Sequence, residues 1–165
     1  MSDASIEDFH LAAGKLLQNA STNELFLAKV FEVLLSGASV RIAHAAFYSL
    51  DSLNGKANLL RRVAEVAATE SERKCIDRLI EGAKKSNSQR NSAAHSLLIF
   101  DAPDLKSGMR NIRLKAQKFE MISKASLAAM ILTSSEAMTE GQVALKEFCD
   151  SRKVSVLLDV TYLDP

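Results

Sequence analysis

Three side chains near the middle of the chain are of types that can do chemistry at a phosphate. They belong to the string Arg90-Asn91-Ser92-Ala93-Ala94-His95. An imidazole titrates near neutral pH, so His95 is suited to taking or delivering a proton. The guanidinium of Arg90 keeps its charge and suits a phosphate oxygen, and the amide of Asn91 would orient the imidazole or hold a second oxygen. We therefore take Arg90, Asn91 and His95 as the candidate catalytic residues.

A polar surface turn between two helical segments is the alternative interpretation of this string. In a continuous helix, Asn91 and His95 would share one face, because they are four residues apart. Arg90 and His95 would point roughly 140° apart around the axis. One copy would struggle to place both on the same phosphate, whereas a two-fold axis would bring the same patch together twice. The spacing therefore favours a homodimer if the string is a site.

The string lies in a basic segment, residues 82–119. This segment has eight Lys or Arg residues and two Asp, a net charge of +6, whereas the chain of 165 residues carries +1 and the rest of it therefore −5. A basic segment on a near-neutral chain fits a polyanionic partner. A solvated basic surface would give the same pattern.

Composition and missing motifs exclude several other classes of function. Apolar residues make up 47% and charged residues 25% of the chain, the balance of a globular domain. There is no Walker A loop, GxGxxG, HExxH or GxSxG, and neither the histidines nor Cys75 and Cys149 have metal-ligand spacing. We expect no cofactor and no metal. Residues 1–10 do not form a signal peptide, and no apolar run approaches the ~18 residues of a membrane span, so we expect a cytoplasmic protein without a membrane partner.

Helical patterning accounts for most of the chain. Apolar residues at helical spacing predict helices over residues 5–18, 22–35, 39–51, 56–67, from 70 onward, and 122–149. Capping boxes at residues 21–24 and 69–72, and a weaker one at 5–8, mark helix starts. Ser36-Gly37 and Asn54-Gly55 mark breaks.

The second half of the chain is less regular. A polar stretch at 84–92 precedes apolar residues at 93–94 and 97–100, which predicts one long helix or two pieces. Residues 101–108 are expected to form a loop, and alternation at 112–116 predicts a short strand. The alternating tail at 154–162 would pair with that strand or with a partner chain. The predicted fold class is all-α, an up-and-down bundle of about five helices with a short extended or β appendage. It comprises one domain over residues 1–150 and an extended tail over 151–165.

The string and its helical frame resemble the HEPN superfamily (higher eukaryotes and prokaryotes nucleotide-binding domain). The signature of that family is an Arg, then a polar Asn, Asp or His, then three residues and a His. An apolar helix before the string, the small pair Ala93-Ala94, a basic loop and a long final helix extend the resemblance over roughly residues 21–149. One branch of the family has a Tyr two residues after the His, which a partner nucleotidyltransferase antitoxin modifies. Leu97 stands there, which counts against that branch.

The resemblance implies a HEPN-like fold and a dimer whose paired motifs form one cleft. It also implies metal-independent cleavage of RNA by its own 2′-hydroxyl, in a bacterial defence, toxin or stress system. His95 would move the protons, Arg90 would stabilise the charge on the phosphorane, and Asn91 would orient the imidazole or hold an oxygen. The expected partners are RNA, a second copy and an antitoxin or regulatory protein. Backbone contacts to RNA are expected from Lys84, Lys85, Arg110, Arg113, Lys115 and Lys118.

Two other functions fit the same sequence. A non-catalytic helical HEPN module would bind a nucleotide, RNA or a protein partner without cleaving it. A helical interaction module would have no ligand, and its basic segment would only be solvated. The position of Arg90 and His95 across a dimer cleft would separate the first of these from a nuclease.

Overall fold

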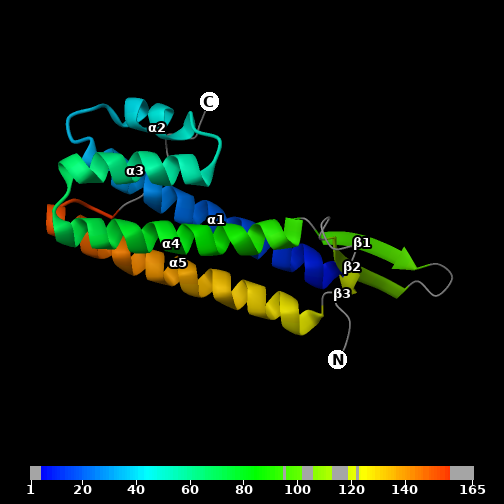
Figure 1. The fold of residues 1–165 in the computed structure, drawn as a ribbon. Helices are drawn as coiled ribbons and strands as arrows, with labels where there is room; N and C mark the ends of the chain where they lie inside the picture. Colours follow the sequence, from blue (N-terminus) through cyan, green and yellow to red (C-terminus); the bar gives the residue numbers. More distant parts are fainter. Residues whose placement is uncertain (1–4, 95, 102–105, 113–118, 122, 157–165) are drawn as a thin grey trace. The chain divides into compact units, whose positions relative to one another are not determined.

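The computed structural model describes residues 5–94, 96–101, 106–112, 119–121 and 123–156. Within these ranges the chain forms five helices and three strands, which can be followed in Figure 1. The helices are α1 (Ile6–Leu34), α2 (Val40–Tyr48), α3 (Leu53–Ala67), α4 (Glu70–Ala94) and α5 (Lys124–Arg152). The strands are β1 (Ser96–Asp101), β2 (Lys106–Ile112) and β3 (Phe119–Met121). The predicted helical bundle of about five helices is confirmed.

The chain divides into two compact units, each built from segments that are distant in sequence. The first unit comprises Met1–Ser21 and Lys85–Ala137, and the second comprises Thr22–Lys84 and Met138–Pro165. Helices α1, α4 and α5 each contribute one segment to both units. The two units have different interiors.

The second unit has a hydrophobic core to which all five helices contribute. Phe47 of α2 is fully buried and its ring centroid lies 5.6 Å from that of Phe31 of α1. Leu60 of α3 and Phe148 of α5 are also fully buried in the same cluster. Burial of such apolar side chains is the main force that holds the helices together.

The interior of the first unit is partly polar. Ala12 and Leu127 are buried in a small apolar cluster, but Ser86 of α4 and Ser134 of α5 are fully buried too. The Ser86 hydroxyl donates to the Ser134 carbonyl oxygen at 3.3 Å, and the Ser134 hydroxyl donates to the Ser86 Oγ at 3.3 Å. Asn19 of α1 is buried and its Nδ2 donates to the Ser135 Oγ at 3.2 Å. Small hydroxyl side chains that satisfy one another let α4 and α5 approach closely here.

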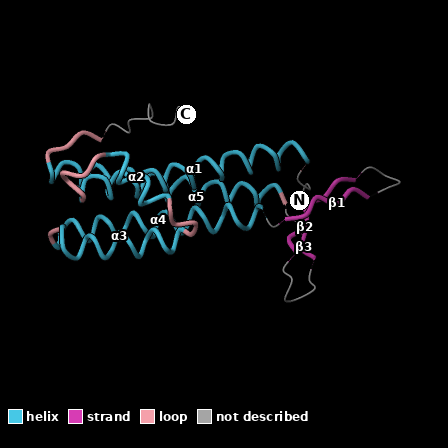
Figure 2. The backbone as a smooth tube through the Cα atoms, turned by 90° about the horizontal axis from the view of Figure 1, so that it is seen from above, coloured by secondary structure: helices cyan, strands magenta, loops and turns pink. Residues whose placement is uncertain are grey.

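A three-stranded antiparallel sheet follows α4 in the chain. Its order is β1-β2-β3 (Figure 2), with Asp101 opposite Lys106 and Leu97 opposite Arg110. On the other side of β2, Arg110 is opposite Met121. The predicted loop at 101–108 was therefore wrong at residues 106–108, which belong to β2, and at Asp101, which ends β1. Of the strand predicted at 112–116, only Ile112 lies within the described residues, as the last residue of β2.

One continuous helix replaces the two predicted at 5–18 and 22–35. The capping box at residues 21–24 was wrong, because α1 continues through these residues and the Glu24 carboxylate finds its partner on another helix instead of on a free backbone N–H group. Glu24 pairs with Lys56 of α3, and Asn23 is 1% exposed. Tertiary contacts have overridden a local capping signal.

Other helix boundaries followed their local signals. Thr69 and Glu72 form the reciprocal capping box predicted for α4, with 2.7 Å from the Thr69 backbone N to a Glu72 carboxylate oxygen and 3.3 Å from the Glu72 N to the Thr69 Oγ1. Ser5 and Asp8 do the same at the start of α1. Gly37 has a φ of 106°, as the predicted break requires. The break at Asn54-Gly55 was wrong, because Ser52 accepts a hydrogen bond from the Gly55 N–H and starts α3 earlier.

The apolar residues at 97–100 do not continue the helix or form a second helical piece, the two alternatives predicted for them. Helix α4 includes the whole polar stretch at 84–92, and the apolar residues at 97–100 form β1. A run of four large apolar residues is long enough for a strand and too short for a helix. At the other end, α5 extends to Arg152, and Val156 packs against the core of the second unit. Of the alternating tail predicted at 154–162, residues 154–156 are described and form no strand, and residues 157–162 lie outside the described residues.

Candidate functional site

The polar stretch of α4 places two of the three candidate catalytic residues in its last turns. Arg90 and Asn91 are both half-buried. At 100° per residue, Arg90 lies about 40° from Ser86 around the helix, close to the buried line that faces α5. The stretch stays helical because it has no Gly or Pro and its Ser86 finds a hydroxyl partner on α5.

The guanidinium of Arg90 is hydrogen-bonded through its Nη2 and buried at its Nε. Its Nη2 donates to the Asn87 Oδ1 at 2.5 Å. Its Nε is buried and has no hydrogen-bond acceptor among the described residues. Among the residues whose side chains the structure describes, no carboxylate pairs with Arg90, whereas Arg78 and Arg152 pair with Glu147 and Glu72. Arg90 therefore keeps a positive charge that no described neighbour neutralises.

His95 lies outside the described residues, so its distance from Arg90 and Asn91 stays a prediction. Its neighbours in the chain are described. Helix α4 ends at Ala94 and β1 begins at Ser96. The i, i+4 relation expected for Asn91 and His95 requires a helix that continues through His95, and it stays a prediction because α4 is described only as far as Ala94.

The six residues expected to contact RNA fall into three groups. Lys84 donates to the exposed Glu81 carboxylate at 2.9 Å, and the same carboxylate lies 3.6 Å from Arg61. Lys85 is exposed, and Arg110 stands in the middle of β2. The others lie outside the described residues: Arg113, Lys115 and Lys118.

Asn87 is a site residue that the sequence analysis missed. It is half-buried in α4, three residues before Arg90, and supplies the acceptor for the Arg90 guanidinium. The signal that could have found it is the i, i+3 relation to Arg90, since residues three apart are neighbours on a helix. The stretch from 82 to 100 has no acidic residue, which leaves amides and hydroxyls as its side-chain acceptors.

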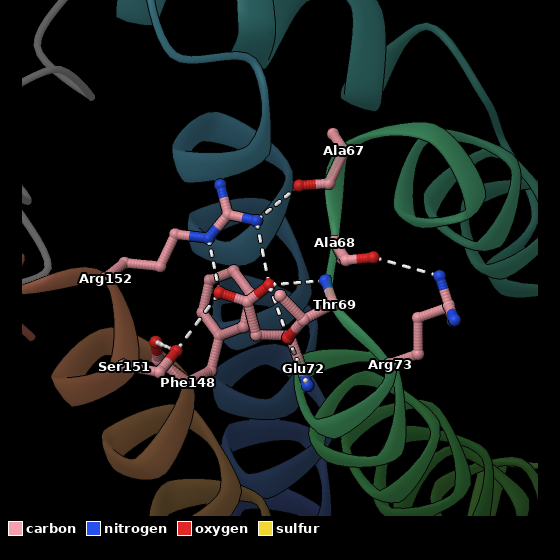
Figure 3. Close-up of polar contacts among 8 residues, drawn as sticks. All are labelled: Ala67, Ala68, Thr69, Glu72, Arg73, Phe148, Ser151 and Arg152. Atoms are coloured by element: carbon pink, nitrogen blue, oxygen red, sulfur yellow. Dashed lines mark hydrogen bonds and ion pairs between the residues drawn. The ribbon is translucent and has the colours of Figure 1, made fainter.

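The second unit contains a buried carboxylate that ties α4 to α5 (Figure 3). The Glu72 side chain is 7% exposed. Its carboxylate accepts hydrogen bonds from the Nε of Arg152 at 2.6 Å and from the Ser151 hydroxyl at 3.1 Å. The Arg152 Nη2 also donates to the Ala67 carbonyl oxygen. Hydrogen bonds from Arg152, and then from Thr69, lower the pKa of Glu72 to about 2 from an ordinary 4.5. This cluster joins two helix ends, and we assign it to stability.

A second buried charge lies between α1, α2 and α3. The ammonium of Lys56, 9% exposed, pairs with Glu24 and lies 4.8 Å from the ring centroid of Tyr48. We expect the double change Lys56→Met with Glu24→Gln to leave the free energy of unfolding within about 1 kcal/mol of the wild type, because it removes the desolvation of both ions together with their attraction. Urea denaturation would measure this. A loss above about 2 kcal/mol would show instead that the ion pair is strongly stabilising.

The described ranges also contain two cysteines and the acidic residues and histidines that could bind a metal. Cys75 and Cys149 are free and buried, and burial raises the pKa of the Cys149 thiol. No three His, Cys, Asp or Glu side chains group as a metal site within the part of the chain described. No helix there has the length and apolar character to cross a bilayer.

Comparison with family models, with curated proteins and with solved structures finds no match to this chain. The HEPN resemblance therefore stands on the string at residues 90–95 and the helical frame alone.

Proposed function

We propose that this protein is a metal-independent endoribonuclease of HEPN type that acts as a homodimer, in a bacterial defence, toxin or stress response. The proposal rests on three residues in one string and on the basic segment around them. The catalytic residues would be Arg90, Asn91 and His95.

The state of the Arg90 guanidinium is the observation that carries the proposal. A buried donor without an acceptor is costly in a folded protein, and the Arg90 Nε is such a donor among the described residues. The charge of Arg90 also has no carboxylate partner there. An arginine in this state suits an anionic ligand, because its fork of N–H groups matches phosphate oxygens.

The reaction would need no group beyond the chain and the RNA. The 2′-oxygen attacks the adjacent phosphorus, the bond from phosphorus to the 5′-oxygen breaks, and the products are a 2′,3′-cyclic phosphate and a 5′-hydroxyl. One imidazole takes the 2′-OH proton and a second, protonated imidazole gives a proton to the leaving 5′-oxygen. Arg90 stabilises the extra negative charge on the phosphorane. RNA, not DNA, would be the substrate because only RNA has the 2′-hydroxyl.

A dimer supplies what one chain lacks for this reaction. Each chain has one His95, and the reaction uses an imidazole as base and another as acid. A two-fold axis near the end of α4 would bring both copies of the string to one phosphate. The proposed partners are thus RNA and a second copy, with an antitoxin or regulatory protein as a further proposal.

The test is cleavage of labelled single-stranded RNA in the presence of EDTA, at matched dimer concentration. We expect wild type to cleave and His95→Ala to lose at least about 100-fold in rate, the usual contribution of general acid–base catalysis. His10→Ala is the matched control, because His10 is an exposed histidine on α1, and it should cleave like wild type. RNA with 2′-O-methyl groups should bind and stay intact.

No cleavage by the wild type, or equal cleavage by wild type and His95→Ala, would contradict the nuclease proposal. Salt-sensitive binding of the intact RNA would then favour the non-catalytic HEPN module, since phosphate contacts weaken steeply as salt rises. Sedimentation of the wild type at the assay concentration tests the dimer separately.

A further inference from the structure

We propose that Asn87 is a positioning residue that fixes the guanidinium of Arg90 for its work on a phosphate. This inference rests on the proposed function for its catalytic part. Its structural part is that the hydrogen bond from Arg90 to Asn87 immobilises the guanidinium, and this part is tested without RNA.

The contact itself has an unambiguous direction. The Arg90 Nη2 lies 2.5 Å from the Asn87 Oδ1. A guanidinium has five N–H donors and no acceptor, so the amide oxygen of Asn87 is the atom that must face it. The two residues are three apart on α4, where side chains are neighbours.

Burial at Nε and the bond at Nη2 together define the plane of the guanidinium. With the Nε turned into the protein and one N–H of Nη2 committed to Asn87, the free N–H groups are those of Nη1 and the second N–H of Nη2. A free arginine side chain loses about 2 kcal/mol of rotamer entropy when a ligand immobilises it. Here part of that loss has already occurred on folding, which favours ligand binding.

The chemistry of the acceptor matters as much as its position. Three other arginines of the described chain pair with carboxylates: Arg61 with Asp77, Arg78 with Glu147 and Arg152 with Glu72. Asn87 is neutral, so it orients Arg90 without cancelling its charge. An aspartate at the same place would hold the guanidinium equally well but would compete with the phosphate for its charge.

The first measurement is ¹⁵N NMR of the arginine side chains in the full-length protein, with Arg90→Lys used for assignment. We expect slow rotation about the Cζ–Nη2 bond of Arg90 in the wild type and in Asn87→Asp, and fast rotation in Asn87→Ala. Ser88→Ala is the control, because Ser88 is exposed and next in the same helix. Alanine is the better helix former, so Asn87→Ala should remain folded.

The second measurement is single-turnover cleavage of the same RNA. We expect Asn87→Ala to be about tenfold slower than wild type, the effect of losing one hydrogen bond to a charged group. Asn87→Asp should also be slower, since its charge is wrong although its geometry is right. In an Arg90→Ala background, Asn87→Ala should cause no further loss, because Asn87 acts through Arg90.

The two proposals fail in different ways. If wild type cleaves RNA but Arg90 rotates equally slowly in Asn87→Ala, or if the losses from Asn87→Ala and Arg90→Ala multiply, the inference is wrong and the proposed function stands. If wild type cleaves no RNA, the proposed function is wrong, and Asn87 positions nothing catalytic whatever the NMR spectrum shows.

Discussion

Glu72→Gln is expected to lower the free energy of unfolding by about 3 kcal/mol at pH 7. Its carboxylate is 7% exposed and bonds to Arg152, Ser151 and Thr69. A pKa of about 2 against an ordinary 4.5 corresponds to about 3 kcal/mol that folding gains from the charged form. The neutral amide also leaves the Arg152 guanidinium without its counter-charge.

The same pKa fixes how the stability of the wild type depends on pH. Because the folded state binds this proton more weakly than the unfolded state, the stabilisation is fully present above about pH 5 and is lost as pH falls toward 2. The amide of Glu72→Gln does not titrate. The difference between wild type and variant should therefore shrink steadily between pH 5 and pH 2.

Urea denaturation at several pH values would test this expectation. Glu147→Gln is the control, because Glu147 pairs with Arg78 while both side chains are 50% exposed. That change should cost less than about 1 kcal/mol, as is usual for exposed ion pairs. A difference between wild type and Glu72→Gln that stays constant from pH 7 to pH 2 would show that the Glu72 carboxylate is not the titrating group.

Two helical glycines should respond to alanine with opposite signs. At Gly141 in α5, an added Cβ would lie 2.7 Å from the Asn23 Oδ1 and 3.3 Å from a ring carbon of Phe26. At Gly14 in α1, it would meet no atom within 4 Å. Alanine removes the conformational cost of glycine in a helix in both cases, so only the contact at Gly141 separates them.

Gly141→Ala is expected to destabilise the protein by about 2 kcal/mol, because the overpacking exceeds the gain in helix propensity. Gly14→Ala should stabilise it by about 0.5–1 kcal/mol. Thermal and urea unfolding of both variants would measure the effects. The cost at Gly141 should fall in an Asn23→Ala background, which removes the clashing atom, and an undiminished cost there would contradict the packing explanation.

Much of the helical fold could be predicted because its signals are local. Apolar residues at helical spacing located all five helices, and the capping pair Thr69 and Glu72 formed as predicted. The capping signal at residues 21–24 failed because Glu24 found Lys56, 32 residues away, as its partner. A capping box is a competition between nearby backbone groups and distant partners, and the sequence shows only the nearby ones.

In the candidate site, too, the residue types could be read from the sequence, whereas the contacts between them depend on tertiary packing. The string at residues 90–95 is visible in the sequence because it resembles the HEPN signature. The hydrogen bond from Arg90 to Asn87, and the burial of the Arg90 Nε, depend on which face of α4 packs against α5. The ion pair between Lys84 and Glu81 also depends on the folded helix, and the RNA contact expected of Lys84 stays a prediction.

The sequence by itself therefore determined the helical class, most of the helix starts and the basic segment, and it supplied the candidate residues at 90–95 as a prediction. Only the tertiary structure decided that α1 is one helix, that residues 97–100 form a strand, and that Arg90 is oriented by a neutral amide. The reason is physical: propensity and capping act within about one helical turn. The partner of a polar or charged side chain is instead chosen by whichever distant element packs against it.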